Sequence, residues 1–376
     1  MSLRQLRKEN RMLVKVPLVK NGIEKLHEEI SYFISQIGAA KKWSKNLFHS
    51  DFYNQVISQN PRLEELLRQF FKEFNKLPTN RKAEIIQEFR SYNSVKEICN
   101  VITPVSSHWR DSTYPDFRKT TQTLFIFMYE ETLAKVSYKN FSGESIKDHY
   151  NTYRQTYSIS MCPFCGLEDY KDLHDELTAR DAYDHYLDKA RYPFAAVNPE
   201  NLFPMCHECN SGSKKSQDIL HEDKTNIRRV APYPPDDEFQ ISIRIDDAFM
   251  QDISVSITLI DTSNPNVVAK FNTWLTVFQI RQRYEGRVKK KKQDWLADIS
   301  ASLNPATLST DLPQSLKTSY ENCLDSLDRI KQREHHLKAP FLFYCMAHLN
   351  SVIKFFDNDP NYAKYLKRRS GALNKH

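Results

Sequence analysis

Two Cys-x-x-Cys pairs carry the clearest chemistry in this sequence. One pair lies in Cys162-Pro163-Phe164-Cys165-Gly166, and the other lies in Cys206-His207-Glu208-Cys209-Asn210. Four thiolates presented by two tight turns suit the tetrahedral coordination of structural zinc. A redox pair would occur once beside a βαβ pattern, and a disulfide framework would need a denser set than 7 Cys in 376 residues. The spacing therefore predicts one structural Zn²⁺, with these ligands: Cys162, Cys165, Cys206 and Cys209.

An Asp-His pair, Asp184-His185, lies between the two cysteine pairs. It belongs to a short run over residues 182–187 that reads as a strand, where neighbouring side chains point to opposite faces. One site can use both residues only if the strand ends or bends there. The oxygens of Asp184 and Asn210 suit Mg²⁺ or Mn²⁺, and His185 can then act as a general base. The alternative is a structural histidine, but its position between the cysteine pairs favours a functional one.

These residues resemble the HNH (His-Asn-His, ββα-metal) endonucleases in a four-cysteine form, similar to the recombination endonuclease VII type. The resemblance covers residues 162–216. It rests on Asp184-His185-Tyr186-Leu187-Asp188-Lys189, on Tyr192-Pro193, and on Asn201-Leu202-x-Pro204-x-Cys206-x-x-Cys209-Asn210. It implies a central ββα-metal module and hydrolysis of DNA phosphodiester bonds.

The resemblance also implies a role for each matching residue. His185 would be the general base that activates water, and Asn201 would orient the histidine-bearing loop through backbone hydrogen bonds. Asp184 and Asn210 would bind the catalytic Mg²⁺ or Mn²⁺, while the four cysteines would bind the structural zinc. The sequence departs from the family at Asn210, where many members have a histidine. This change makes the catalytic site harder and less suited to zinc. It departs again at Asp188, where proline is common, which should alter the loop more than the chemistry.

The charge of the chain agrees with an anionic substrate without requiring one. The net charge is +7 and the pI is about 8.8, which is only mildly basic. Lys189, Lys214 and Lys215 are candidates for phosphate contacts, although exposed lysines are as often simply solvated. The densest basic run, 281–292, could follow a nucleic-acid backbone or form the polar face of a surface helix. The surface helix is the preferred interpretation.

The flanking sequences give the expected architecture. Apolar residues recur at helical spacing between Pro61 and Pro78, and residues 239–245 and 253–259 alternate as two strands of a hairpin do. A further helix is expected over 268–284. The fold class is therefore α+β and mainly helical. We expect a helical N-terminal domain at 1–160, the nuclease module at 161–230, and a small sheet near 238–260 with a helical C-terminal region over 231–376.

Three classes of function remain open at this stage. The first is a metal-dependent endonuclease that cuts DNA, with RNA left open as the alternative substrate. The second is a zinc-containing nucleic-acid-binding module without cleavage. The third is a nuclease effector of bacterial anti-phage defence, regulated by a partner such as an ATPase, a use that the family resemblance suggests. One module makes one active site, so a double-strand break would need two turnovers or two copies, which a homodimer would supply. No apolar run spans a membrane, so we expect a cytoplasmic protein. With only 7 Gly and no Gly-rich phosphate loop, a kinase or ATPase is not expected.

Overall fold

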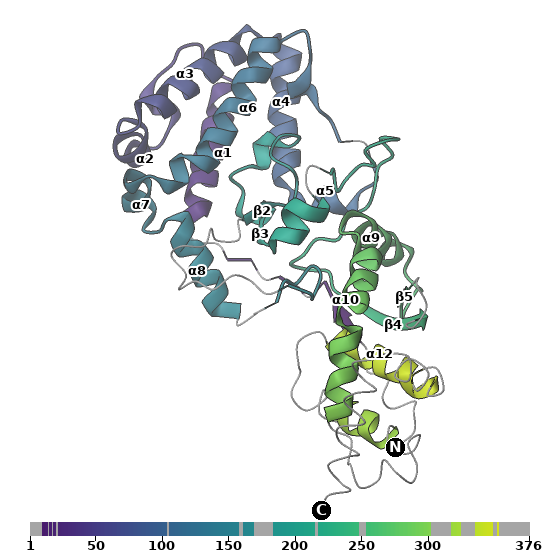
Figure 1. The fold of residues 1–376 in the computed structure, drawn as a ribbon. Coiled ribbons are helices and arrows are strands. Elements are labelled where there is room, and N and C mark those ends of the chain that lie inside the picture. The colour runs from purple at the N-terminus through teal and green to yellow at the C-terminus, as the bar shows by residue number, and fades with distance from the viewer. Residues whose placement is uncertain are drawn as a thin grey trace, which may run out of the picture. The chain divides into compact units, whose positions relative to one another are not determined.

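The computed structural model describes most of the chain, and it forms two compact units. The larger unit comprises Leu13–Glu238 and Pro265–Phe278, and the smaller comprises Met1–Met12, Phe239–Asn264 and Gln279–His376. Helices dominate and two small antiparallel sheets accompany them, so the protein has the expected α+β, mainly helical fold (Figure 1). The described residues are 10–13, 15–16, 18–19, 22–103, 105–157, 161–168, 183–214, 217–247, 253–301, 317–324, 335–348 and 352.

The larger unit contains most of the helices and one two-stranded sheet. In this sheet β2 pairs with β3 in antiparallel register, with His185 opposite Leu202. Short helical turns and loops connect these elements. The helices are α1 (Gly22–Ile37), α2 (Ser50–Phe52), α3 (Pro61–Lys76), α4 (Thr79–Asn93), α5 (Val95–Asn100), α6 (Pro115–Glu130), α7 (Val136–Ser142), α8 (Ile146–Tyr157) and α9 (Pro265–Val277), and the strands are β2 (Tyr183–His185) and β3 (Leu202–Pro204).

Helix α3 shows how the sequence positions the helical core. The Asn60 side chain caps its first turn by accepting a hydrogen bond from the Leu63 amide at 3.2 Å, and Pro61 occupies the first helical position. The apolar stripe then faces α6, where the Phe70 ring lies 5.5 Å from the Phe117 ring and 6.2 Å from the Phe125 ring. The buried residues are those that the spacing predicts: Leu63, Leu66, Leu67, Phe70, Phe71 and Phe74.

The histidine-bearing loop shares its core with these helices. Phe194, which is fully buried, places its ring 5.7 Å from Phe89 of α4 and 5.1 Å from Phe125 of α6. Asn93 at the end of α4 donates to the Phe194 carbonyl at 3.1 Å and accepts from the Asn198 side chain, through its own carbonyl, at 3.0 Å. The segment that contains Phe194 and Asn198 is therefore packed into the helical region rather than set apart from it.

Helix α9 returns to the same unit from much later in the chain. Its Trp274 indole donates to the Phe164 carbonyl, between the first two cysteines, at 2.8 Å. Thr273 donates to the Val230 carbonyl at 2.7 Å. The expected domain boundaries near 160 and 230 remain a prediction, but no boundary of the two compact units falls at either position.

The smaller unit is a three-stranded antiparallel sheet in the order β1-β4-β5, together with helices. The strands are β1 (Asn10–Met12), β4 (Phe239–Asp247) and β5 (Ser254–Leu259), and the helices include α10 (Ile280–Ala301) and α12 (His335–Ala347), with residues 317–324 also helical. The expected hairpin is present. The expected helix over 268–284 is wrong in one respect: it breaks at Gln279, whose φ of 50° is left-handed and cannot continue an α-helix.

Within the described residues, no helix is both long enough and apolar enough to cross a membrane.

Helix α4 carries a buried carboxyl group, Glu88, which is 2% exposed. One of its oxygens accepts a hydrogen bond from the Trp109 amide at 3.2 Å. Burial raises the pKa of Glu88 from 4.5 to about 7, because the charged form is poorly solvated there. The folded protein therefore keeps this proton over a range of pH in which the unfolded chain has lost it.

We predict that Glu88→Gln stabilises the protein at alkaline pH. Because the folded pKa lies above the unfolded one, the wild-type side chain favours folding most below about pH 4.5, and this advantage is lost as pH rises towards 7. Above pH 7 the penalty is at most about 3 kcal/mol, from about 1.4 kcal/mol per pKa unit. Thermal unfolding should be measured at pH 5 and pH 8. The unfolding temperature of the glutamine variant should exceed that of the wild type mainly at pH 8.

The exposed Glu97 of α5 gives a matched control, since Glu97→Gln makes the same chemical change outside the core. It should follow the wild-type protein at both pH values. A Glu88→Gln variant that also runs parallel to wild type would show that this carboxyl does not set the pH dependence.

Candidate metal centre and adjoining histidine

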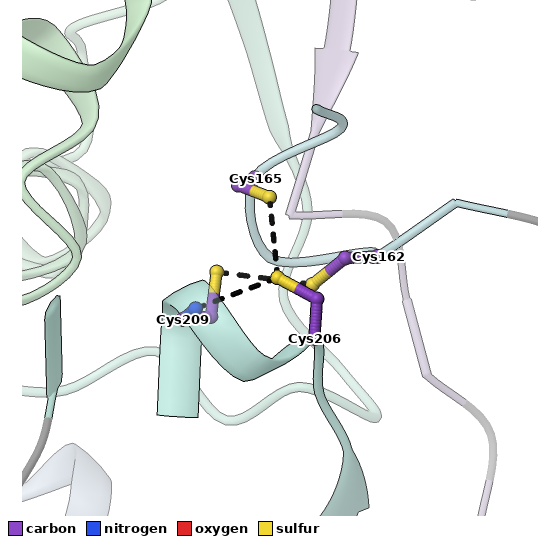
Figure 2. A group of neighbouring side chains, drawn as sticks. All are labelled: Cys162, Cys165, Cys206 and Cys209. Atoms are coloured by element: carbon purple, nitrogen blue, oxygen red, sulfur yellow. Dashed lines mark hydrogen bonds between the residues drawn. The ribbon is translucent and has the colours of Figure 1, made fainter. Parts of the chain in front are cut away.

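The four cysteines of the two pairs converge in the larger unit (Figure 2). Their sulfurs all lie within 4.8 Å of one another, with Cys162 and Cys209 at 3.8 Å and Cys165 and Cys206 at 3.9 Å. A tetrahedral zinc ion with Zn–S bonds of about 2.3 Å separates its sulfurs by about 3.8 Å. These spacings fit zinc and are far longer than a disulfide bond. The cluster can therefore hold one zinc ion, as the spacing predicts.

Tight turns aim the thiols of both pairs inward. In the first turn the Gly166 amide donates to the Cys162 carbonyl at 2.8 Å, and Gly166 has a φ of 62°, which glycine adopts without strain. The Leu167 amide then points at the Cys165 sulfur at 3.5 Å. The second turn repeats the pattern, since the Cys209 amide points at the Cys206 sulfur at 3.4 Å. Amide hydrogens directed at sulfur stabilise thiolates, which are the forms that bind zinc.

The four cysteines are buried, so their thiolate forms need a cation beside them. All four cysteines are buried, and desolvation raises the pKa of Cys162 and of Cys209 well above the usual thiol range. Several thiolates cannot share such a site without a compensating positive charge. A divalent ion provides that charge and replaces the protons, so the donor set and the burial both fit zinc.

His185 lies at the end of β2 and is 7% exposed. Its Nε2 is 2.9 Å from the Ala196 carbonyl oxygen. Because a carbonyl oxygen only accepts, this nitrogen must carry the hydrogen, and Nδ1 then has the free lone pair. Burial, followed by the nearby charge of Lys189, lowers the pKa of His185 to about 3. The ring is therefore neutral at physiological pH, and the lone pair of Nδ1 has a defined orientation.

Asn201 organises the loop on both sides of this histidine. Its side chain is fully buried and accepts from the Leu187 amide at 2.7 Å. Its amide group donates to the carbonyls of Leu187 at 3.0 Å and Ala195 at 3.1 Å. These are backbone hydrogen bonds of the kind implied for Asn201 by the family resemblance. They tie the strand that carries His185 to the turn that carries the carbonyl of Ala196.

Lys214 is buried, whereas the sequence predicts an exposed lysine available for phosphate contacts. It is 1% exposed, and its ammonium donates to the His185 carbonyl at 2.8 Å. Its helix, the π-helix Glu208–Lys214, is thereby held beside β2. In this structure Lys214 supports the backbone of the histidine and is not a surface contact for phosphate. Because lysines are seldom buried, nothing in the sequence indicates this role.

Of the other expected site residues, the structure describes Asn210 fully, Asp184 by its backbone alone, and Lys215 not at all. Asn210 lies in the same π-helix, one turn before Lys214, and is partly exposed. The backbone of Asp184 pairs with Phe203 of β3, but its side chain is outside the described residues. Lys215 also lies outside them. The proposed catalytic ligands thus come from two elements that the His185–Lys214 contact brings together.

The end of α6 reaches this histidine, which the sequence did not indicate. The Tyr129 ring packs edge-on against His185 with centroids 4.2 Å apart. Lys189 lies 5.1 Å from the centre of that tyrosine ring and pairs with Glu130 at 2.6 Å. An exposed ion pair contributes about 1 kcal/mol or less, so a phosphate group can compete with Glu130 for Lys189. Only tertiary packing brings α6 to these residues, and no motif marks them.

Fold and site together define a mainly helical α+β protein with a buried four-cysteine cluster that can hold zinc. No protein-family model matches the chain, and no solved structure does. Among curated proteins it is similar to Protein ea31 of Escherichia phage lambda, with 28% identity over 116 residues. That alignment covers 26% of this chain and 36% of the phage protein, so the similarity is confined to part of each.

Proposed function

We propose that this protein is a metal-dependent HNH endonuclease that hydrolyses DNA phosphodiester bonds. The observation that carries the proposal is the setting of His185, whose Nε2 donates to the Ala196 carbonyl. That hydrogen bond leaves Nδ1 as a base on a strand fixed by Asn201. The four-cysteine cluster, proposed to bind structural zinc, joins a turn that precedes this strand in the chain to a turn that follows it. The arrangement supports the roles that the sequence resemblance implies.

The proposed chemistry assigns one proton transfer to His185. Its Nδ1 takes a proton from a water molecule aligned with the scissile phosphorus, and the hydroxide attacks. The P–O3′ bond breaks and the departing O3′ takes a proton from solvent water, leaving a 5′-phosphate and a 3′-hydroxyl. His185 then returns its proton to solvent. Asn201 and Lys214 act through the backbone by holding His185 in place. Lys189 can leave Glu130 and contact the phosphate.

A catalytic divalent ion fits the donor types available beside this histidine. Asp184 and Asn210 would supply a carboxylate and an amide oxygen, which are hard ligands preferred by Mg²⁺ and Mn²⁺. When bound, such an ion would supply charge neutralisation at the phosphate and at the departing oxygen. The cysteine cluster would keep zinc apart in a soft, closed site.

We further propose a cytoplasmic role as a nuclease effector in bacterial anti-phage defence. The support is the large helical region packed around the module, which offers surface for a regulatory partner such as an ATPase. The contacts of Tyr129 and Glu130 with His185 and Lys189 give that region a direct connection to the site. Expression from an inducible promoter should then damage host DNA once the partner is supplied.

Cleavage of supercoiled plasmid tests the proposed activity. We expect nicked and linear DNA with Mg²⁺ or Mn²⁺, and none with a chelator. Relaxed duplex, single-stranded DNA and RNA should be compared in parallel, since DNA is the proposed substrate class. Nucleic acid that is retained but never cut, even with excess protein and Mn²⁺ and with the candidate partner added, would contradict the proposal. That result would favour a zinc-containing nucleic-acid-binding module.

A further inference from the structure

Helix α10 of the smaller unit has two different faces. The buried side packs against β5 and α12 and consists of Ile280, Tyr284, Val288, Trp295 and Leu296. The opposite side is exposed and consists of Gln282, Gly286, Lys289, Lys290 and Gln293. This exposed stripe has no carboxylate and no large apolar side chain. It presents ammonium and amide hydrogen-bond donors along one side of the helix.

The charge around this stripe is strongly one-sided. Residues 281–292 contain seven basic residues and a single acid, Glu285. A Glu285 oxygen lies 3.3 Å from the Val255 amide in β5, so this carboxylate is directed at the sheet. Lys291 pairs with Asp294 at 2.9 Å. In the part of the chain that the structure describes, Lys289 and Lys290 have no carboxylate partner.

Gly286 lies in the middle of the exposed stripe. Glycine is a poor helix former because it loses more backbone freedom than other residues. Here packing does not require it, since a Cβ at this position would meet nothing within 4 Å. Three of its neighbours one turn away, Gln282, Lys289 and Lys290, are exposed and place donors around the bare backbone. The missing side chain leaves a shallow notch in a basic face, where a bulky anion can approach the helix closely.

We propose that this face of α10 binds the phosphate backbone of duplex DNA. The basic segment 281–292 is about 18 Å long at 1.5 Å per residue. One DNA strand presents about five phosphates over that length. Lysines and glutamines make such contacts without regard to sequence. The surface lies in a different compact unit from His185, so the proposal goes beyond cleavage and does not depend on it.

Other anionic partners fit the face less well. A helix that binds a membrane surface presents bulky apolar side chains beside its basic ones, and this stripe has none. Protein interfaces are depleted in lysine relative to the rest of the surface, because its ammonium group is strongly hydrated. A regular polyanion gains from each lysine through the release of condensed counterions.

The test is binding of a labelled 30-bp random duplex, measured by fluorescence anisotropy in buffer without added Mg²⁺ or Mn²⁺ and without a chelator that would remove zinc. Replacing two exposed lysines by glutamine, K289Q/K290Q, should weaken binding about tenfold or more at low salt. The slope of log affinity against log salt concentration should fall by about 2, close to the expected 0.9 per lost phosphate contact. The matched control is K41Q/K42Q, an exposed adjacent pair in the larger unit, which should change binding less than about twofold.

A second variant tests the notch itself. Gly286→Leu should preserve or raise thermal stability, since it restores a good helix former in open space. It should nevertheless weaken DNA binding, because leucine covers the backbone without adding a hydrogen-bond donor. Equal losses for the two lysine pairs, or a Gly286→Leu variant that binds like wild type, would overturn the proposal. So would a K289Q/K290Q variant that loses binding to polyglutamate or phosphatidylserine vesicles but keeps it to DNA.

Discussion

Replacing Cys206 by serine should release bound zinc and unfold the module around His185. The wild-type chain should contain one zinc ion, and the variant should contain none. Cys206 lies between β3 and the π-helix Glu208–Lys214, so its sulfur joins both elements to the first cysteine pair. A hydroxyl group is a poor zinc ligand at neutral pH, and three thiolates would leave the ion incompletely held.

The size of the effect follows from the coupling of metal binding to folding. Structural zinc contributes an apparent 10–16 kcal/mol in small zinc domains at neutral pH, roughly the whole stability of a typical domain. The larger unit also has a shared aromatic core around Phe194, which zinc loss does not remove directly. We therefore expect the helical region to survive partly while the module unfolds. Zinc analysis, circular dichroism and thermal unfolding would separate the two.

Cys99→Ala provides the matched control for this prediction. Cys99 is also fully buried in the larger unit, but it is not one of the four clustered cysteines. The control should keep its zinc and lose only the stability that a small core truncation costs. A Cys206→Ser variant that retains one tightly bound zinc would show that the cluster is not the metal site.

The sequence predicts local structure well where a single periodicity decides it. The apolar stripe of α3 and the alternation in β4 and β5 each bury a face that is visible in the residue pattern. Strand β1 was not expected, because three residues are too few to show a period and its pairing with β4 is supplied by the partner strand. The break at Gln279 was missed for a related reason: apolar residues continue on both sides of it.

The candidate site shows the same division between local and tertiary information. The four cysteines converge as predicted because their spacing already encodes two tight turns that can present four thiols to one metal ion. The contact of Tyr129 with His185 depends on the way α6 packs, and Lys214 is buried against the sequence preference of lysine. The hydrogen bond from the Trp274 indole to the Phe164 carbonyl depends on helix α9, which begins about a hundred residues after Phe164 in the chain. Such pairings have no signal in a single sequence.

Replacing His185 by alanine should abolish DNA cleavage while leaving zinc bound. Loss of a general base typically slows a reaction by about 10²–10⁴-fold, and the proposed mechanism assigns this role to no other residue. The rate of plasmid nicking under single-turnover conditions measures this loss. Alanine also leaves the Ala196 carbonyl without its partner, at a cost of about 1–3 kcal/mol. Part of any defect could then come from the loop rather than from the base.

His185→Gln separates these two causes. The glutamine amide can donate to the Ala196 carbonyl in place of Nε2, but an amide does not accept a proton at neutral pH. We therefore expect glutamine to restore thermal stability towards wild type and to leave cleavage as slow as in the alanine variant. His207→Ala is the matched control, since that histidine lies in the same module with its side chain 68% exposed. Cleavage by His185→Gln at the wild-type rate would show that His185 holds the loop and that the base lies elsewhere.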